Sequence, residues 1–302
     1  MSDPTTLRVL QLNAGSLLEP GWPERRLEVV AWIDRLEPDV VCLQEVWEDA
    51  SNPNTAGWLA EQAAGTWHVA FGGAPFAPEL WADQQLRFGS AVLSRWPIDE
   101  HHHVRLPTVD DPDPWPHQIP WEMVHARTAG LDVFSVHLAS APTHGRHRRA
   151  QVLAIDEYVR RVRGDLDTVQ GIGRQRDAMP AILCGDFNAE PDSDEIRFLT
   201  SLTVLEDRTA FWQDAWRVAG DDGPGHTQDW RTNPIADAMN LNRKRIDYVF
   251  VGDGFQRRGN AGRVRDVGLA CHEPLTGVMA SDHAGVVADI TWPDRPTPAP
   301  GR

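Results

Sequence analysis

Cysteine is scarce in this chain, and its scarcity limits the chemistry to expect. The 302 residues include three cysteines, Cys42, Cys184 and Cys271, each within an apolar, strand-like run. An odd number at wide spacing fits neither a disulfide framework nor a zinc site built from cysteines. We therefore expect buried, reduced thiols in a cytoplasmic protein.

Positive charge is also in short supply. Lys and Arg total 29 against 44 Asp and Glu, so the formal net charge is −15. This balance argues against a general basic surface for nucleic acid, because neutralisation of phosphates by Lys and Arg supplies most non-specific affinity. It leaves room for a local basic groove. Acidic residues gathered around bound divalent cations would explain part of the excess.

Long apolar runs are absent as well. No stretch approaches the roughly 20 apolar residues that cross a bilayer. Residues 1–6 have no basic segment followed by an apolar one, so we expect a soluble chain without a signal peptide. No repeat or composition shift marks a second domain. We expect one domain over residues 7–292 and a disordered tail over 293–302, where four prolines fall.

Apolar runs and alternating patterns predict short strands and a few helices. The expected strands cover residues 7–12, 39–43, 67–72, 87–98, 124–127, 131–138, 182–186, 246–251, 264–271 and 285–292. The expected helices cover 23–36, 58–65, 150–163 and 193–202, the first with an apolar face of Leu27, Val30, Ala31 and Ile33. Residues 110–120 are expected to form a long irregular loop, of the kind that often shapes a binding site.

The sequence Gly185-Asp186-Phe187-Asn188 follows the apolar run 182–184. We expect the glycine to let the backbone turn tightly at the strand end. Asp186 and Asn188 would then enter a shared cleft, while Phe187 anchors the turn in the core. The same residue types are ordinary in a surface turn, so the interpretation as a site depends on the rest of the chain.

Other polar residues also stand at the ends of apolar strands. They are Asn13, Glu45, His137, Asp247, Asp282 and His283. Carboxylate and amide oxygens without cysteine describe a site for a hard cation, Mg²⁺ or Mn²⁺. Two histidines beside it supply acid and base groups near neutral pH. Phosphate ester hydrolysis uses this combination, because the metal offsets the charge of the phosphoryl oxygens.

Six short motifs carry these residues in order along the chain. They are Leu12-Asn13, Leu43-Gln44-Glu45, His137, Gly185-Asp186-Phe187-Asn188, Arg245-Ile246-Asp247-Tyr248 and Ser281-Asp282-His283. Together they resemble the endonuclease/exonuclease/phosphatase superfamily, and six motifs in register are specific although each alone is weak. The resemblance implies a metal-dependent phosphoric ester hydrolase with a deoxyribonuclease I-like fold, a single four-layer α/β/β/α sandwich.

The resemblance also implies a metal side of the site. Glu45 would be the principal ligand of Mg²⁺ or Mn²⁺. Asn13 would lie beside it and bind the metal or its water, and Asp282 would complete this side. Whether one or two metals bind stays open.

The resemblance implies catalytic roles for the remaining motif residues. Asp186 and Asn188 would orient the nucleophilic water and the scissile phosphate. His283, held by Asp247, would contact a phosphoryl oxygen or activate the water, and His137 would hydrogen-bond the phosphate or protonate the leaving oxygen. The general base is then either Asp186 or the pair of His283 and Asp247.

The substrate class stays open between two interpretations. The acidic composition and thirteen tryptophans, Trp47 among them as a candidate contact, favour a phosphodiesterase or phosphatase acting on a small molecule or a lipid headgroup, the phosphodiesterase being preferred. The basic cluster with Arg146 and Arg149 favours a nuclease, with tryptophans stacking on bases, although a solvated helix entry explains the cluster equally well. A non-catalytic binding protein on the same scaffold is a remote third interpretation, because every expected catalytic side chain is present. No obligate protein partner is evident.

Overall fold

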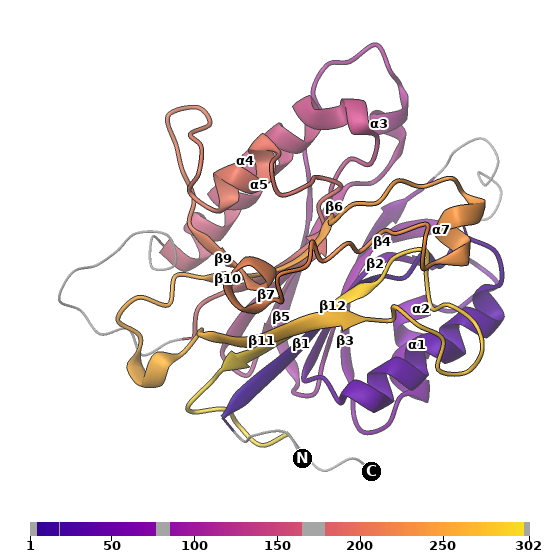
Figure 1. Ribbon diagram of the computed structural model, residues 1–302, viewed down its shortest axis with the longest axis horizontal. Coiled ribbons are helices and arrows are strands. Elements are labelled where there is room, and N and C mark those ends of the chain that lie inside the picture. Colours follow the sequence, from indigo (N-terminus) through magenta and orange to yellow (C-terminus); the bar gives the residue numbers. More distant parts are fainter. Residues whose placement is uncertain (1–4, 18, 77–84, 165–178, 299–302) are drawn as a thin grey trace.

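The computed structural model describes residues 5–17, 19–76, 85–164 and 179–298. These residues form two six-stranded sheets that pack face to face, with helices over the outer face of each (Figure 1). The layers therefore run helix, sheet, sheet, helix, which confirms the expected α/β/β/α sandwich.

The first sheet combines both ends of the chain. Its strands, in spatial order, are β11 (Val264–Ala270), β12 (Gly285–Thr291), β1 (Thr6–Asn13), β2 (Val40–Glu48), β4 (Arg87–Ser94) and β3 (His68–Pro75). Helices α1 (Trp22–Leu36) and α2 (Thr55–Gln62) cover its outer face, where Val29 and Leu59 share a buried cluster with Leu10 and Leu43. Strands β1 and β2 are parallel, because α1 crosses between them.

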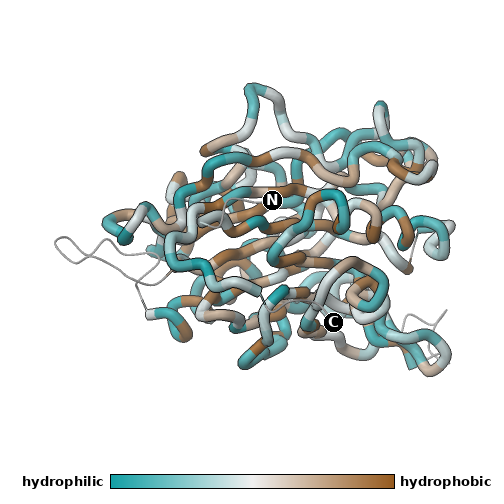
Figure 2. The backbone as a smooth tube through the Cα atoms, turned by 90° about the horizontal axis from the view of Figure 1, so that it is seen from below, coloured by the Kyte–Doolittle hydropathy of each residue, from teal (hydrophilic) through white to brown (hydrophobic). Residues whose placement is uncertain are grey.

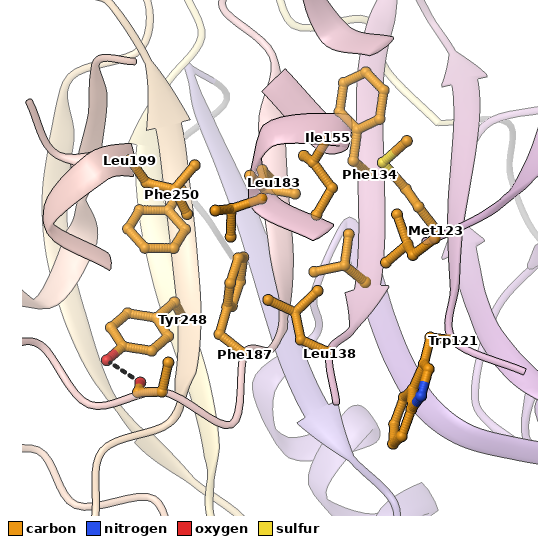
Figure 3. Packing of buried hydrophobic residues seen from close by; sticks show 14 of the residues in the cluster. Trp121, Met123, Phe134, Leu138, Ile155, Leu183, Phe187, Leu199, Tyr248 and Phe250 are labelled. Carbon is orange, nitrogen blue, oxygen red and sulfur yellow. Dashed lines mark hydrogen bonds between the residues drawn. The ribbon is translucent and has the colours of Figure 1, made fainter. Parts of the chain in front are cut away.

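The second sheet comes from the middle of the chain. Its strands, in spatial order, are β5 (Ile98–Arg105), β6 (Glu122–Thr128), β7 (Leu131–His137), β8 (Ile182–Asp186), β10 (Asp247–Gly252) and β9 (Trp212–Asp214). Helices α4 (Gly145–Arg163) and α5 (Asp194–Leu199) cover its outer face, and Ile155 packs there beside Phe134 and Leu183 (Figure 3). Short helices in the connections are α3 (Trp115–Gln118), α6 (Ala215–Ala219), α7 (Pro234–Ala238), η2 (Pro142–His144) and η4 (Arg258–Asn260).

A third apolar layer lies between the two sheets. Leu7 and Val9 of β1 point into it, whereas Leu10 and Leu12 of the same strand point towards the helices. This alternation is the period of two that a strand imposes on its side chains. Apolar segments accordingly run through the interior of the molecule, and hydrophilic segments lie mainly at its periphery (Figure 2). The three cysteines are free and buried, as expected.

The buried face of α1 differs from the expected one. Leu27 is 53% exposed, whereas Val29 and the charged residues Arg25 and Glu28 are buried. Burying a charge requires hydrogen bonds, and Glu28 accepts them from the backbone of residues 275–276. The apolar pattern of the sequence missed this face because two charged side chains occupy it.

Several boundaries also differ from the expected ones. The expected strand over residues 87–98 ends at Ser94, and β5 follows it in the other sheet. The loop over residues 110–120 contains α3, and α4 begins at Gly145 rather than near Ala150. Within the described part of the chain, no helix is long and apolar enough to cross a membrane.

The proline-rich tail makes contacts over its first residues. Arg295 forms an ion pair with Asp39, and the indole of Trp96 donates a hydrogen bond to the carbonyl of Pro296 (3.2 Å). This part of the segment expected to be disordered therefore lies against the first sheet, because its cation and carbonyl groups find partners there. Residues 299–302 lie outside the described residues.

Candidate active site

The candidate site lies where the apolar layer between the sheets gives way to polar residues. Alternation places Asn13 on the same side of β1 as the apolar residues that face the second sheet. In the same way, His137 ends the inner face of β7, Asp186 ends that of β8, and Asp247 begins that of β10. Two sheets thus direct four polar side chains towards one end of the gap between them.

The strand register brings these side chains together. Asp186 is the partner of His137 in the parallel pair β7–β8 and of Asp247 in the antiparallel pair β8–β10. From the first sheet, Asn13 Nδ2 donates to Asp186 Oδ2 (3.0 Å) and to Glu45 Oε1 (3.1 Å). His137 Nε2 lies 3.6 Å from Asp186 Oδ2. The predicted residues therefore form one connected group.

A bulge in β2 turns Glu45 into this group. The β2–β4 register shifts between Leu43 and Val46, and both of these residues face the helices. Glu45 is the extra residue, with a φ of 57° in the left-handed region. Regular alternation would direct its side chain away from the gap, and a bulge of this kind redirects a side chain. Its Oε2 atom is buried and has no hydrogen-bond partner among the described residues.

The glycine before Asp186 has a different structural role from the expected one. Gly185 lies inside β8 without a left-handed φ, and a Cβ there would come within 2.2 Å of the Val136 carbonyl oxygen. The turn falls instead at Asn188, whose φ is 48°. Gly185 therefore permits close approach of two strands. Phe187 is fully buried and packs edge-on against Tyr248, as expected of an anchor (Figure 3).

The turn after β8 is held by its own polar atoms. Asn188 N donates to Asp186 Oδ1 (2.8 Å), and Asn188 Nδ2 donates to the carbonyl of Leu138 (3.0 Å). The hydroxyl of Tyr248 donates to the carbonyl of Ala189 (2.8 Å), the bond drawn in Figure 3. These bonds fix Asp186 and Asn188 relative to His137 at the end of the neighbouring strand.

His283 forms the pair with Asp247 that the sequence predicts. Its Nδ1 atom lies 2.8 Å from Asp247 Oδ2. The other ring nitrogen, Nε2, lies 3.0 Å from the side-chain amide of Gln228 and 3.7 Å from Asp282 Oδ2. Asp247 therefore orients the ring, and Nε2 faces the remaining polar residues.

A buried network of glutamine side chains lies next to the pair of His283 and Asp247, between the two sheets. Gln44 Nε2 donates to Gln11 Oε1 (3.1 Å) and to Ser135 Oγ (3.0 Å). Gln11 Nε2 lies 3.3 Å from Asp247 Oδ1. The network connects the two sheets directly beneath the site, where satisfied buried polar groups rigidify their surroundings.

These residues open into a cleft of about 180 Å³. It is lined by Glu19, Glu45, Phe76, Phe88, Trp115, Ile119, Trp121, His137, Ser140, Asp186, Asn188, Gln228, Met239, Asp282 and His283. Four of these side chains are carboxylates and six are large and apolar. None of the described lining residues is a lysine or an arginine.

Three predicted substrate contacts lie elsewhere. Arg146 and Arg149 are exposed on the first turns of α4, and Trp47 packs partly buried against the core; none of the three lines the cleft. Arg148, between the two arginines, is buried, pairs with Glu195 (3.2 Å) and donates to two backbone carbonyls in residues 139–141. The basic cluster therefore helps to hold the loop that follows β7.

Burial and the crowding of carboxylates raise the pKa values of the acid groups in the cleft. Burial, with added repulsion from Asp282, raises the pKa of Glu45 to about 7. Burial and the charges of Glu45 and Asp282 raise the pKa of Glu19 to about 9. Burial and the charge of Asp247 raise the pKa of Asp186. Each shift reflects negative groups held close together with little solvent.

The pKa values of the two histidines are shifted in opposite directions. Burial lowers the pKa of His137. Burial opposes the charge of His283 too, but Asp247, Asp282 and Asp186 outweigh it and hold the pKa of His283 well above its usual value. The difference follows from the neighbours, because His137 also packs against the rings of Trp121 and Phe88.

A divalent cation fits the acidic part of the cleft. Glu45 and Asp282 repel one another there, and Glu45 Oε2 is a buried acceptor without a described partner. Oxygen donors of this kind bind Mg²⁺ or Mn²⁺. Ligand atoms of Asp186, Asp247 and His283 also lie within 4.8 Å of one another. In that second group Asp247 already binds the imidazole, which leaves it less free to bind a cation.

Some lining residues were missed at the level of sequence. Glu19 and Gln228 lie in loops without a strand-end context, and no sequence signal distinguishes them. Trp115 and Trp121, by contrast, belong to the proline-rich stretch around the loop that was expected to shape a binding site, and both line the cleft. Trp115 is 40% exposed at the cleft.

Comparison with known proteins places these observations in a family. The model of the Endonuclease/Exonuclease/phosphatase family matches residues 10–283. No curated protein matches the chain significantly.

Solved structures are similar in fold. An endonuclease/exonuclease/phosphatase from Beutenbergia cavernae DSM 12333 is 23% identical, with a TM-score of 0.69 over 98% of this chain and 74% of that one. The human Nocturnin catalytic domain with bound sulfate is 21% identical, with a TM-score of 0.64 over 95% and 94%. D. rerio TDP2 complexed with a single-strand DNA product is 17% identical, with a TM-score of 0.67 over 95% and 99%.

Proposed function

The chain belongs to the endonuclease/exonuclease/phosphatase family, whose members are metal-dependent phosphoester hydrolases, and from this premise we propose that it hydrolyses phosphodiesters of small or lipid-like molecules. The observation that carries the choice is the lining of the cleft. Four carboxylates and no described lysine or arginine line it, so a substrate with several phosphates would lack counterions there. A single phosphate bearing an apolar group is the better fit.

The apolar lining suits such a group. Trp121 lies with its ring 5.2 Å from the His137 ring in an edge-on arrangement, and Phe88 packs on Phe76 at 5.1 Å. Trp115 and Ile119 continue this lining at the cleft. Aromatic side chains bind apolar or flat groups through buried area and ring contacts. A substituent of the phosphate would lie here, next to His137.

Mg²⁺ or Mn²⁺ would be held by Glu45, Asn13 and Asp282. When bound, the cation would offset negative charge on the phosphoryl oxygens. Asn13 also donates to Asp186 and Glu45, so one amide couples the cation ligands to the residues that act on the phosphate.

The remaining polar residues act on the phosphate and the water. Asp247 holds Nδ1 of His283, so Nε2 is the atom that contacts a phosphoryl oxygen or exchanges a proton with water. Asp186 is the second group placed to take a proton from the attacking water. Asn188 orients the phosphate, and His137 donates to it or to the leaving oxygen.

Substrate preference tests the proposal. The purified protein is assayed with bis(p-nitrophenyl) phosphate and p-nitrophenyl phosphate in Mg²⁺ and in Mn²⁺. We expect a higher kcat/KM for the diester. Preference for the monoester would reject the phosphodiesterase assignment in favour of a phosphatase.

A nuclease is the second candidate, because an exposed aromatic ring at the cleft, Trp115, could stack on a base. The similar TDP2 structure contains a single-strand DNA product. Nucleic-acid affinity falls steeply with salt when many phosphates are contacted. Cleavage of single-stranded DNA with a steep salt dependence, at a higher kcat/KM than the small diester, would favour this candidate.

The free, buried cysteines support a cytoplasmic location for either activity.

A further inference from the structure

The loop between β1 and α1 brings a carboxylate to the cleft that none of the six motifs contains. Glu19 is 6% exposed and lines the cleft together with Glu45 and Asp282. A Cβ built on Gly15 would lie 2.4 Å from Glu19 Oε2 and 2.9 Å from Asp282 Oδ1. The two carboxylates therefore converge on the small space that Gly15 leaves, and its φ of 52° also favours glycine.

A buried arginine holds the loop that carries Glu19. Arg25 is 3% exposed, and its described hydrogen bonds all go to backbone carbonyls. The acceptors are Ala14, Gly15, Glu19, Pro20 and Ala280. One side chain thus fixes the loop that carries Glu19 to the segment that leads into Asp282. The approach of the two carboxylates is a consequence of this clamp.

Two carboxylate oxygens of the cleft lining have no hydrogen-bond partner in the described part of the chain. Glu19 Oε2 and Glu45 Oε2 are both buried, and neither has a hydrogen-bond partner among the described residues. A buried carboxylate is strongly unfavourable unless it is paired or coordinates a metal. Both residues line the same cleft, so a cation bound there is a candidate partner for each oxygen.

We propose that Glu19 is an additional ligand of the divalent cation, beside Asn13, Glu45 and Asp282. The inference rests on the proposed function only in that the cation is the one hydrolysis uses. Three carboxylates and one amide make a more negative site than the motif residues alone provide. Because the affinity of hard-cation sites rises with the number of charged ligands, this chain should bind Mn²⁺ more tightly than it would without Glu19.

Direct binding of Mn²⁺ tests the proposal without turnover. The full chain, Glu19→Gln and Glu24→Gln are titrated with Mn²⁺ and followed by electron paramagnetic resonance. Glu24 is an exposed glutamate at the start of α1, so its replacement is a matched control. We expect Glu19→Gln to weaken Mn²⁺ binding by about tenfold or more and Glu24→Gln to leave it unchanged. Equal affinity of the wild type and Glu19→Gln would overturn the proposal.

Thermal unfolding separates a ligand from a structural residue. Without metal, Glu19→Gln is nearly isosteric and should leave Tm almost unchanged; with saturating Mn²⁺, the metal-induced rise in Tm should shrink. A lower Tm without metal, together with an unchanged Mn²⁺-induced rise, would show a structural role and contradict the proposal. Tight Mn²⁺ binding that needs Glu19, without hydrolysis of any phosphodiester, would reject the proposed function and leave this inference standing.

Discussion

The two sides of the cleft differ in origin and in chemistry. The acidic side, from the strand ends and loops of the first sheet, consists of Glu19, Glu45 and Asp282, with Asn13 bound to Glu45. The apolar side, mainly from the segment between β5 and β6, consists of Phe76, Phe88, Trp115, Ile119 and Trp121. The opposite pKa shifts of the two imidazoles follow this division, because aromatic rings lie beside His137 and carboxylates lie beside His283. In the proposed function, the acidic side would carry the chemistry and the apolar side would select the substrate.

The largest expected effect comes from His283, which serves any substrate. His283→Ala should lower kcat on bis(p-nitrophenyl) phosphate by about 10²–10⁴-fold, the usual range for a positioned acid or base. Mn²⁺ affinity should change little, because the imidazole is not among the proposed ligands. Steady-state kinetics and a Mn²⁺ titration check both parts. Wild-type turnover in this variant would remove His283 from the mechanism.

Loss of a ligand on the acidic side should be next in size. Glu45→Ala should lower activity at a fixed low Mn²⁺ concentration by about 100-fold, since even residues that support metal ligands contribute 10–100-fold. Added Mn²⁺ should restore part of the activity. Exposed Glu61 on α2 provides a control substitution, Glu61→Ala. A metal titration curve that coincides with that of the control would contradict the assignment of Glu45.

The apolar side should affect substrate choice alone. Trp115→Ala should raise KM for an aromatic diester by about 2- to 13-fold, the equivalent of the roughly 0.5–1.5 kcal/mol of a good aromatic contact. The kcat value and the KM for a methyl diester should hardly change. Trp230, similarly exposed at 45% but not lining the cleft, is the matched control. An equal rise in KM for both diesters would show that Trp115 does not select for the aromatic group.

The smallest effect should come from the basic cluster. Arg146→Ala and Arg149→Ala leave the cleft lining intact, so kcat/KM on a small diester should stay within about twofold, as for most surface changes. The same variants should be tested on single-stranded DNA at several salt concentrations. A large loss on DNA with a flatter salt dependence would bring these arginines back as phosphate contacts and favour a nuclease.

The parts of this fold that depend on local pattern were predictable from sequence. Alternation and apolar runs located most strands, and polar residues at their ends marked Asn13, His137, Asp186 and Asp247 as neighbours. Strand periodicity alone could not explain Glu45, because it reaches the cleft through a bulge with a left-handed φ. Its place after the apolar run 39–43 marked Glu45 as a strand-end residue, but the bulge that turns it into the cleft could not be foreseen.

The loops were not predictable in the same way. Glu19 reaches the cleft because Arg25 binds four carbonyls of residues 14–20 and that of Ala280, which is 255 residues away, and no local pattern encodes such a clamp. Trp115 faces the cleft through the packing of an irregular loop. Gly185 was correctly singled out but for the wrong reason, since the need for close strand approach appears only when Val136 is in place.

The central proposal is that this cleft hydrolyses phosphodiesters with a divalent cation held by its carboxylates. The most direct measurement follows hydrolysis of bis(p-nitrophenyl) phosphate by one preparation of the wild-type protein through three steps: with Mn²⁺, after EDTA, and after Mn²⁺ is restored. We predict turnover in the first step, its loss in the second and its recovery in the third. Turnover that survives EDTA, or none in any step, would contradict the claim.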